Sequence, residues 1–269
     1  MSVINLDNAK RITSSKLLFA DKIIYIKGAA NYMSLIGAKL AKFLDIDTVS
    51  FQRGIYQGKQ VIFSEQYYNK DTEKRITGGK LLREYHEYIE PNHPDAVSPI
   101  DEEYFNNLTD IWGALEFKYG LKYEKDIPEV MMNFVKAFCF DILTGNSDRN
   151  QSNWEIIVSE EKISMAPSYD FDDVFDFISY YLSPEHTEEE EMNYLLENFL
   201  NTSAPEFANI FYEMYDKLTV KELIKIINDV EVEHELELNQ KFKDQIIKEY
   251  TNHRLEIEKI INKRRGKVM

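Results

Sequence analysis

Apolar and polar residues alternate over short runs in the first part of the chain, which is typical of half-buried β-strands. Four such runs form two pairs around the turn sequences Ala20-Asp21-Lys22 and Gln57-Gly58, so the pattern predicts two hairpins. Between the hairpins, a longer stretch places its apolar side chains on one face of a helix. The predicted strands and helix are Leu17–Phe19, Ile23–Ile26, Val49–Arg53, Gln60–Ser64 and Tyr32–Leu44.

After the polar stretch Ser64–Lys70, the apolar positions change to a helical period. One exception is a pair of short runs, Trp154–Val158 and Lys162–Ala166, which predict a third hairpin. Thr219, with Glu222 three residues later, has the sequence of a capping box at the start of a helix. The predicted helices are Thr77–Ile89, Glu102–Tyr119, Pro128–Leu143, Glu188–Leu200, Ala204–Leu218, Val220–Asp229 and His234–Arg264.

This change of period predicts an α+β fold of two lobes. Residues 1–68 are expected to form a small β-rich N-terminal lobe with one helix, and residues 69–269 a larger, mostly helical lobe. A chain of 269 residues is long enough to bury a sizeable core, either as one two-lobed unit or as two small domains.

Composition narrows the classes of function. The net charge of −15 disfavours generic binding to a nucleic-acid backbone or to an anionic membrane surface. No apolar run reaches the roughly eighteen residues of a membrane span, and the first residues lack the apolar core of a secretory signal. The single cysteine, Cys139, lies in an apolar stretch and is expected to be a packed side chain rather than a nucleophile. These features predict a cytoplasmic protein.

Three polar side chains have the spacing of a phosphoryl-transfer site. Asp148 precedes Asn153 by five residues, and Asp170 follows after the predicted third hairpin. Phosphoryl transfer needs Mg²⁺ held against the phosphates and a carboxylate aimed at the attacking hydroxyl. Carboxylate and amide oxygens suit Mg²⁺. Because aspartate and asparagine are also common turn residues, an ordinary surface loop is the alternative. Asp172 and Asp173 are rivals to Asp170 for the metal.

The segments TGNSDRNQSNW and APSYDFDDVF resemble the HipA-like Ser/Thr kinases, whose pattern is roughly GNxDxxxxN followed by PxYD. A weaker similarity in the order of elements extends over Lys16–Phe177. The resemblance implies a two-lobed protein-kinase-like fold, use of ATP and Mg²⁺, and transfer to serine or threonine. It implies Asp148 as the catalytic carboxylate and Asn153 with Asp170 as Mg²⁺ ligands. Asp172 remains the alternative ligand, since the acid that follows P-x-Y is favoured.

The resemblance also assigns the nucleotide side of the site. Lys27, at the end of the strand KIIYIK, corresponds to the strand lysine that reaches the ATP phosphates. The polar segment Thr13-Ser14-Ser15-Lys16 is the candidate phosphate loop, through backbone N–H groups that can form an anion nest. In this family the loop carries an autophosphorylated serine, which implies Ser14 or Ser15. Backbone groups of Glu65 and Tyr67 are expected to meet the adenine edge.

Two departures from the family pattern keep other functions open. Leu35 stands where family members often carry an acid that pairs with the lysine, and the candidate phosphate loop contains no glycine. A catalytically inactive pseudokinase that acts as a binding module is therefore one alternative, and a small-molecule kinase of related fold is another. The expected partner is a protein with a serine or threonine acceptor. An antitoxin or other regulatory protein is a second expected partner, because the family includes toxins of toxin–antitoxin pairs. The family also includes translocated effectors.

Overall fold

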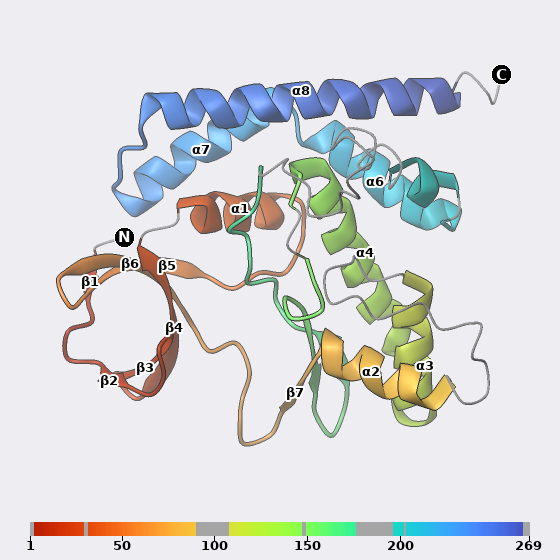
Figure 1. The fold of residues 1–269 in the computed structure, drawn as a ribbon, viewed down its shortest axis with the longest axis horizontal. Helices are drawn as coiled ribbons and strands as arrows, with labels where there is room; N and C mark the ends of the chain where they lie inside the picture. The colour runs from red at the N-terminus through yellow and green to blue at the C-terminus, as the bar shows by residue number, and fades with distance from the viewer. Residues whose placement is uncertain are drawn as a thin grey trace.

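The computed structural model describes residues 3–29, 32–89, 108–146, 149–175, 196–201 and 203–265. Figure 1 shows a curled β-sheet beside a larger group of helices, with one long helix running along the whole molecule. The predicted fold class is confirmed, because the N-terminal region is a sheet with one helix and the C-terminal part is mainly helical. Within the described residues, no helix has the length and apolar character that crossing a membrane requires.

The N-terminal sheet has six strands in the order β1-β5-β6-β4-β3-β2. Both predicted hairpins are confirmed, as β3 with β4 and β5 with β6. Their turns have positive φ at two successive residues, Ala20-Asp21 and Gln57-Gly58, which matches the twist of paired strands. The sequence did not predict β1 and β2, which have two residues each. The strands are Ile4–Asn5, Lys10–Arg11, Lys16–Phe19, Lys22–Ala29, Phe51–Tyr56 and Lys59–Glu65.

The helix α1, Tyr32–Phe43, connects β4 to β5 and is buried along most of its length. Its far side packs against α7, so the helix is enclosed between the N-terminal sheet and the C-terminal helices (Figure 1). The ion pair between Lys39 and Glu233 and the hydrogen bonds from Arg53 to the carbonyl oxygens of His234 and Glu235 join the same parts. The C-terminal helices therefore hold α1 in place.

The remaining described residues form helices and a small antiparallel sheet of order β7-β8-β9. The third predicted hairpin is confirmed as β8 with β9. The strand β7, which pairs with β8, was not predicted. The helices are α2 Gly78–Ile89, α3 Leu108–Tyr123, α4 Ile127–Thr144, α6 Pro205–Lys217, α7 Val220–His234 and α8 Gln240–Arg265, and the strands are β7 Lys74–Thr77, β8 Glu155–Val158 and β9 Ile163–Met165.

Four predicted helix boundaries are wrong. Thr77 ends β7 rather than starting a helix. The helix α3 continues past Gly120 to Tyr123, whose buried ring and hydroxyl bond to the Ser159 carbonyl hold the last turn. The helix predicted to end at residue 229 continues to residue 234, and the next one begins only at residue 240. The helix α7 ends because Glu235 takes the left-handed conformation of a helix C-cap, and in the loop that follows the Glu231 carboxylate accepts the Leu238 N–H at 2.7 Å.

The N-terminal capping of α7 follows the prediction, since the Thr219 hydroxyl accepts a hydrogen bond from the Glu222 amide at 3.2 Å. The first part of the helix predicted from Glu102 and the first part of that predicted from Glu188 lie outside the described residues.

One apolar core joins the two halves of the molecule. It contains side chains of α1, β5, α4 and the C-terminal helices, together with Phe171 from the segment that follows β9. Phe171 is fully buried, with its ring edge-on to Phe51 of the N-terminal sheet and to Phe140 of α4. The two candidate metal-binding acids, Asp170 and Asp172, flank this anchored ring in the chain.

Candidate active site

Lys27 lies between two carboxylates. Its Nζ is 2.7 Å from Oδ1 of Asp170 and 2.8 Å from Oδ1 of Asp172. The lysine comes from β4, where it pairs with Ile62 of β6, and the acids come from the segment after β9. The exposed fractions of the three side chains are 21%, 26% and 38% for the lysine and the two acids. Lys27 therefore contacts two carboxylates that lie far from it in the sequence, and all three side chains are partly shielded from solvent.

Asp172 has a second partner in α1. The hydroxyl of Ser34, which is fully buried in the first turn of the helix, donates a hydrogen bond to the same Asp172 oxygen that faces Lys27. The neighbouring Leu35 points into the apolar core. Asp172 therefore links Lys27 to α1 through Ser34, although α1 has no acid at Leu35.

The backbone around Asp170 is fixed on both sides. Ser168 donates its N–H to the Asp47 carbonyl at 2.9 Å and accepts the Val49 N–H at 3.0 Å. On the other side, Phe171 packs directly on Gly37 of α1, so closely that a Cβ at position 37 would lie 2.5 Å from the Phe171 Cβ. Glycine is therefore needed at residue 37. Asp170 is held by contacts with the N-terminal half of the molecule.

The polar loop after α4 rests on a buried ion pair. Gly145 ends the helix in the left-handed conformation that favours glycine. The Arg149 guanidinium contacts both carboxylate oxygens of Asp141, at 2.9 and 3.1 Å, and the Asn146 amide donates to one of them at 2.6 Å. Arg149 and Asp141 are each only 1% exposed. The loop is therefore tied back to the helix from which it emerges.

The electrostatics of this pair combine burial and attraction. Burial raises the pKa of Asp141, and the opposite charge of Arg149 together with the hydrogen bonds only partly offsets this. For Arg149, burial lowers the pKa, but the attraction of Asp141 outweighs it, and the net pKa is raised. Asp170 adds to the negative potential at Arg149. Both groups are satisfied as an ion pair, which is what a buried charge requires.

A tyrosine pair connects this loop to the segment after β6. The hydroxyl of Tyr169 donates to the Ser152 carbonyl at 2.7 Å, and its ring stacks on Tyr67 with centroids 6.0 Å apart. The Tyr67 hydroxyl in turn donates to Oε2 of Glu155 at 2.5 Å, and Arg75 forms an ion pair with the same carboxylate. Burial and the Glu155 carboxylate raise the pKa of Tyr67, which therefore stays protonated.

The predicted site residues are placed as follows. Asp148, the candidate catalytic carboxylate, lies outside the described residues. Asn153 follows Ser152 directly, with its N–H bonded to the Asn150 carbonyl at 3.0 Å and its carbonyl facing Arg149. The chain neighbours of Asn153 and Asp170 are thus joined by the bond from Tyr169 to Ser152.

The candidate phosphate loop is the tip of the β2–β3 hairpin. Ser14 and Ser15 are exposed there, and the Ser15 carbonyl accepts the Ile26 N–H at 2.8 Å, which ties the tip to β4. Lys16 begins β3, with Nζ 5.2 Å from the centroid of the Tyr25 ring. Glu65 is the last residue of β6, where it pairs with Ile24 of β4.

Sequence reasoning missed several residues that shape the site. Ser34 and the Arg75–Glu155 pair have no local signal, because their partners lie far away in the chain. Asp141 did have one: a carboxylate inside the apolar run FCFDIL needs a buried partner, and an arginine follows in the next loop. This observation would have identified Arg149 as a structural residue.

Comparisons with known proteins bear on the fold. No family model matches the sequence, and no curated protein matches it either. Among solved structures, the proinflammatory kinase CtkA of Helicobacter pylori is similar over 99% of both chains, with a TM-score of 0.66 and 14% sequence identity. HipA of Shewanella oneidensis, in a complex with HipB and operator DNA, covers 94% of this chain with a TM-score of 0.56 and 12% identity, and 66% of its own chain is matched. The predicted resemblance to HipA-like kinases is therefore confirmed at the level of the fold.

Proposed function

We propose that this protein is an ATP- and Mg²⁺-dependent protein Ser/Thr kinase of the HipA-like type. The observation that carries the proposal is the meeting of Lys27 with Asp170 and Asp172 in a fold similar to that of CtkA and HipA. A strand lysine and an acid that follows the catalytic loop are two of the parts that kinases use to hold ATP and its metal. Fold alone does not fix function, so the chemistry of these side chains is the stronger support.

The donor set fits Mg²⁺. Asp170, with Asp172 as the alternative ligand, presents a carboxylate oxygen beside Lys27. Mg²⁺ is commonly held by one or two carboxylates, with phosphate oxygens and water completing its shell. In the described part of the chain, no group of three or more His, Cys, Asp or Glu residues could hold a metal ion. The proposed site binds Mg²⁺ together with the phosphates of the nucleotide.

In this proposal each residue has one role. Asp148 accepts or orients the proton of the attacking hydroxyl, and Asn153 and Asp170 hold the metal. Lys27 contacts the phosphates when the nucleotide is bound. Asp172, which is held by the Ser34 hydroxyl, keeps the lysine oriented. Bound Mg²⁺-ATP supplies the phosphoryl group.

The nucleotide is further held by two segments of the N-terminal lobe. Backbone N–H groups of Ser14, Ser15 and Lys16 are proposed to face the phosphates. Backbone groups of Glu65 and Tyr67 are proposed to contact the adenine. The proposed boundary between the two lobes, after residue 68, then directly follows the segment that contacts the adenine.

The proposed substrate is a protein with a serine or threonine acceptor, and Ser14 or Ser15 is the proposed site of autophosphorylation. Both serines are exposed at a hairpin tip, which leaves their hydroxyls accessible. An antitoxin-like regulator is a second proposed partner, since the similar HipA is found in a complex with HipB.

The test is transfer of radiolabelled γ-phosphate from Mg²⁺-ATP, comparing the wild type with Asp148→Asn. Loss of the carboxylate is expected to reduce transfer about 100-fold or more, because a general base contributes roughly that factor. Asp216→Asn, an exposed position on α6, makes the same chemical change far from the site and is expected to keep full activity.

Thermal-shift titration with Mg²⁺-ATP on the same three proteins separates the alternatives. Equal transfer by wild type and Asp148→Asn would remove the proposed base. Binding of Mg²⁺-ATP without transfer to the protein or to any acceptor would favour the pseudokinase, and transfer only to a small molecule would favour a small-molecule kinase. Absence of nucleotide binding would reject the proposal.

A further inference from the structure

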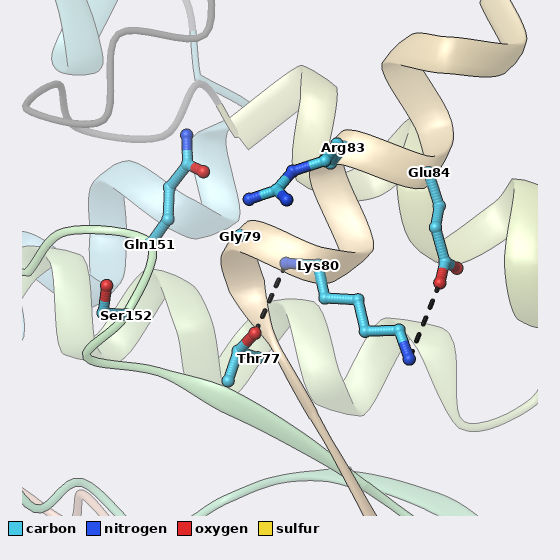
Figure 2. Close-up of a pocket in the computed structure, with 7 residues that line it drawn as sticks. All are labelled: Thr77, Gly79, Lys80, Arg83, Glu84, Gln151 and Ser152. Carbon is cyan, nitrogen blue, oxygen red and sulfur yellow. Dashed lines mark hydrogen bonds and ion pairs between the residues drawn. The ribbon is translucent and has the colours of Figure 1, made fainter.

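A cavity opens directly beside the loop that carries Asn153. It has a volume of about 590 Å³ and lies between the first turns of α2 and the loop residues Gln151 and Ser152. Figure 2 shows Arg83 extending across the cavity towards Gln151, while Lys80 points along the helix to Glu84. The cavity is thus bounded on one side by the proposed catalytic loop and on the other by cationic side chains.

The position of α2 against the loop is fixed by backbone contacts. The Gly78 N–H donates to the Trp154 carbonyl at 3.0 Å, and the Gly79 N–H donates to the Gln151 carbonyl at 2.9 Å. A Cβ at position 78 would lie 2.2 Å from the Trp154 ring, so only glycine permits this approach. The backbone of the first turn of α2, which leads into Lys80 and Arg83, is therefore fixed against the loop.

The charge in the cavity is positive, although the whole chain carries a net charge of −15. Lys80 and Arg83 are both exposed. The one acid of the lining, Glu84, is already in ion pairs, with Lys118 and, at 4.0 Å, with Lys80. Within the described residues, no carboxylate forms an ion pair with Arg83. A guanidinium without a carboxylate partner, facing an open cavity, is suited to a carboxylate or phosphate group from outside the chain.

We propose that this cavity binds an anionic side chain of the protein substrate, either carboxylate or phosphate, at a residue near the acceptor serine or threonine. Arg83 is the main anion-binding residue, with Lys80 contributing at longer range and Gln151 offering a neutral hydrogen bond. The assignment of the anion to a protein substrate rests on the proposed kinase function. The binding of the anion itself can be measured without phosphoryl transfer. The cavity is then a determinant of substrate specificity.

The experiment measures the binding of short labelled peptides by fluorescence anisotropy, without nucleotide and at low salt. Each peptide has a central serine flanked by aspartate, by phosphoserine or by alanine. The wild type is expected to bind both anionic peptides and not the alanine peptide. Arg83→Gln is expected to weaken anionic binding about fivefold, the upper end for one exposed ion pair, and Lys80→Gln to weaken it less. Lys221→Gln, an equally exposed lysine on α7, is the matched control and is expected to change nothing.

Equal binding of the anionic and alanine peptides, or equal losses in Arg83→Gln and Lys221→Gln, would overturn the anion site. Preference for the phosphoserine peptide alone would support it and identify a previously phosphorylated substrate as the source. The same peptides are then tested for γ-phosphate transfer. Transfer that does not depend on the flanking charge would overturn the specificity role while the kinase proposal stands. Selective binding of the anionic peptides without transfer to any of them would keep the anion site and overturn its role in substrate specificity, whereas the kinase proposal is decided by labelling of the protein itself.

Discussion

The inner and outer sides of the candidate site are built differently. On the inner side, Asp141, Arg149 and Phe171 are almost completely buried, and each side chain has defined partners in α4 or in the N-terminal half. On the outer side, Lys80 and Arg83 are exposed and face a cavity. Substitutions on the inner side should therefore change the stability and geometry of the fold, whereas those on the outer side should change what binds and leave stability almost unaltered.

The largest effect is expected from Arg149→Met. The substitution leaves the Asp141 carboxylate buried without its cation, which typically destabilises a protein by about 3–5 kcal/mol. Chemical denaturation, followed by fluorescence of the buried Trp154, measures this loss. The double variant Asp141→Leu with Arg149→Met removes both charges and is the control. It should be more stable than the single variant, and a single variant within about 1 kcal/mol of the wild type would contradict the importance of the pair.

A pH dependence is expected next, from His253 of α8. Its Nε2 is 2.6 Å from the Ile142 carbonyl, which can only accept, so this nitrogen carries the proton. Burial lowers the pKa of His253 to about 4, against about 6.5 in an unfolded chain. Between pH 6.5 and pH 4, His253 binds a proton in the unfolded state but stays neutral in the folded state. Stability should therefore fall by at most about 1.4 kcal/mol per pH unit, down to pH 4.

The measurement is the free energy of unfolding at several pH values for the wild type and His253→Gln. The side-chain amide of glutamine can donate to the same carbonyl but does not titrate. The difference between the two proteins should be constant above pH 6.5 and should shrink as the pH falls. A difference that stays constant over the whole range would show that His253 is not the titrating group.

A smaller loss is expected from Gly37→Ala. The new methyl group would overlap the Cβ of Phe171, which has no free space to move into, and overpacking of this kind costs roughly 1–3 kcal/mol. Gly120→Ala in α3 is the matched control, because its methyl group meets only the flexible end of Glu116, and alanine favours a helix. Thermal denaturation of both variants measures the contrast. If both gain stability, the contact between α1 and Phe171 is looser than described.

The sequence predicted the features with a local signal better than those that depend on tertiary contacts. Hairpins and amphipathic helices have local signals, so the β3–β4 and β5–β6 pairs and α1 could be predicted. The approach of Lys27 to Asp170 followed from a family resemblance rather than from any local pattern. The bond from Ser34 to Asp172 could not be predicted, because it joins residues 138 positions apart in the chain.

The short strands escaped prediction for a related reason. A two-residue strand such as β1 is defined by its partner β5, and nothing in its own sequence distinguishes it from a loop. The same is true of β7, whose polar residues pair with the more apolar β8. Local patterns therefore gave the elements with a buried face, while the pairings that complete the site depended on the tertiary structure.

The smallest effect is expected at Glu65, the last residue of β6. Its carboxylate pairs with Lys22 at 2.8 Å, but the two side chains are 45% and 62% exposed, and such pairs contribute at most about 1 kcal/mol. Glu65→Gln should therefore unfold like the wild type. If its backbone, and not its side chain, meets the adenine, the variant should also bind Mg²⁺-ATP with unchanged affinity in the thermal-shift titration. A marked loss of affinity would place the Glu65 carboxylate itself in contact with the nucleotide. The end of β6 would then contribute a side chain as well as backbone groups to the site.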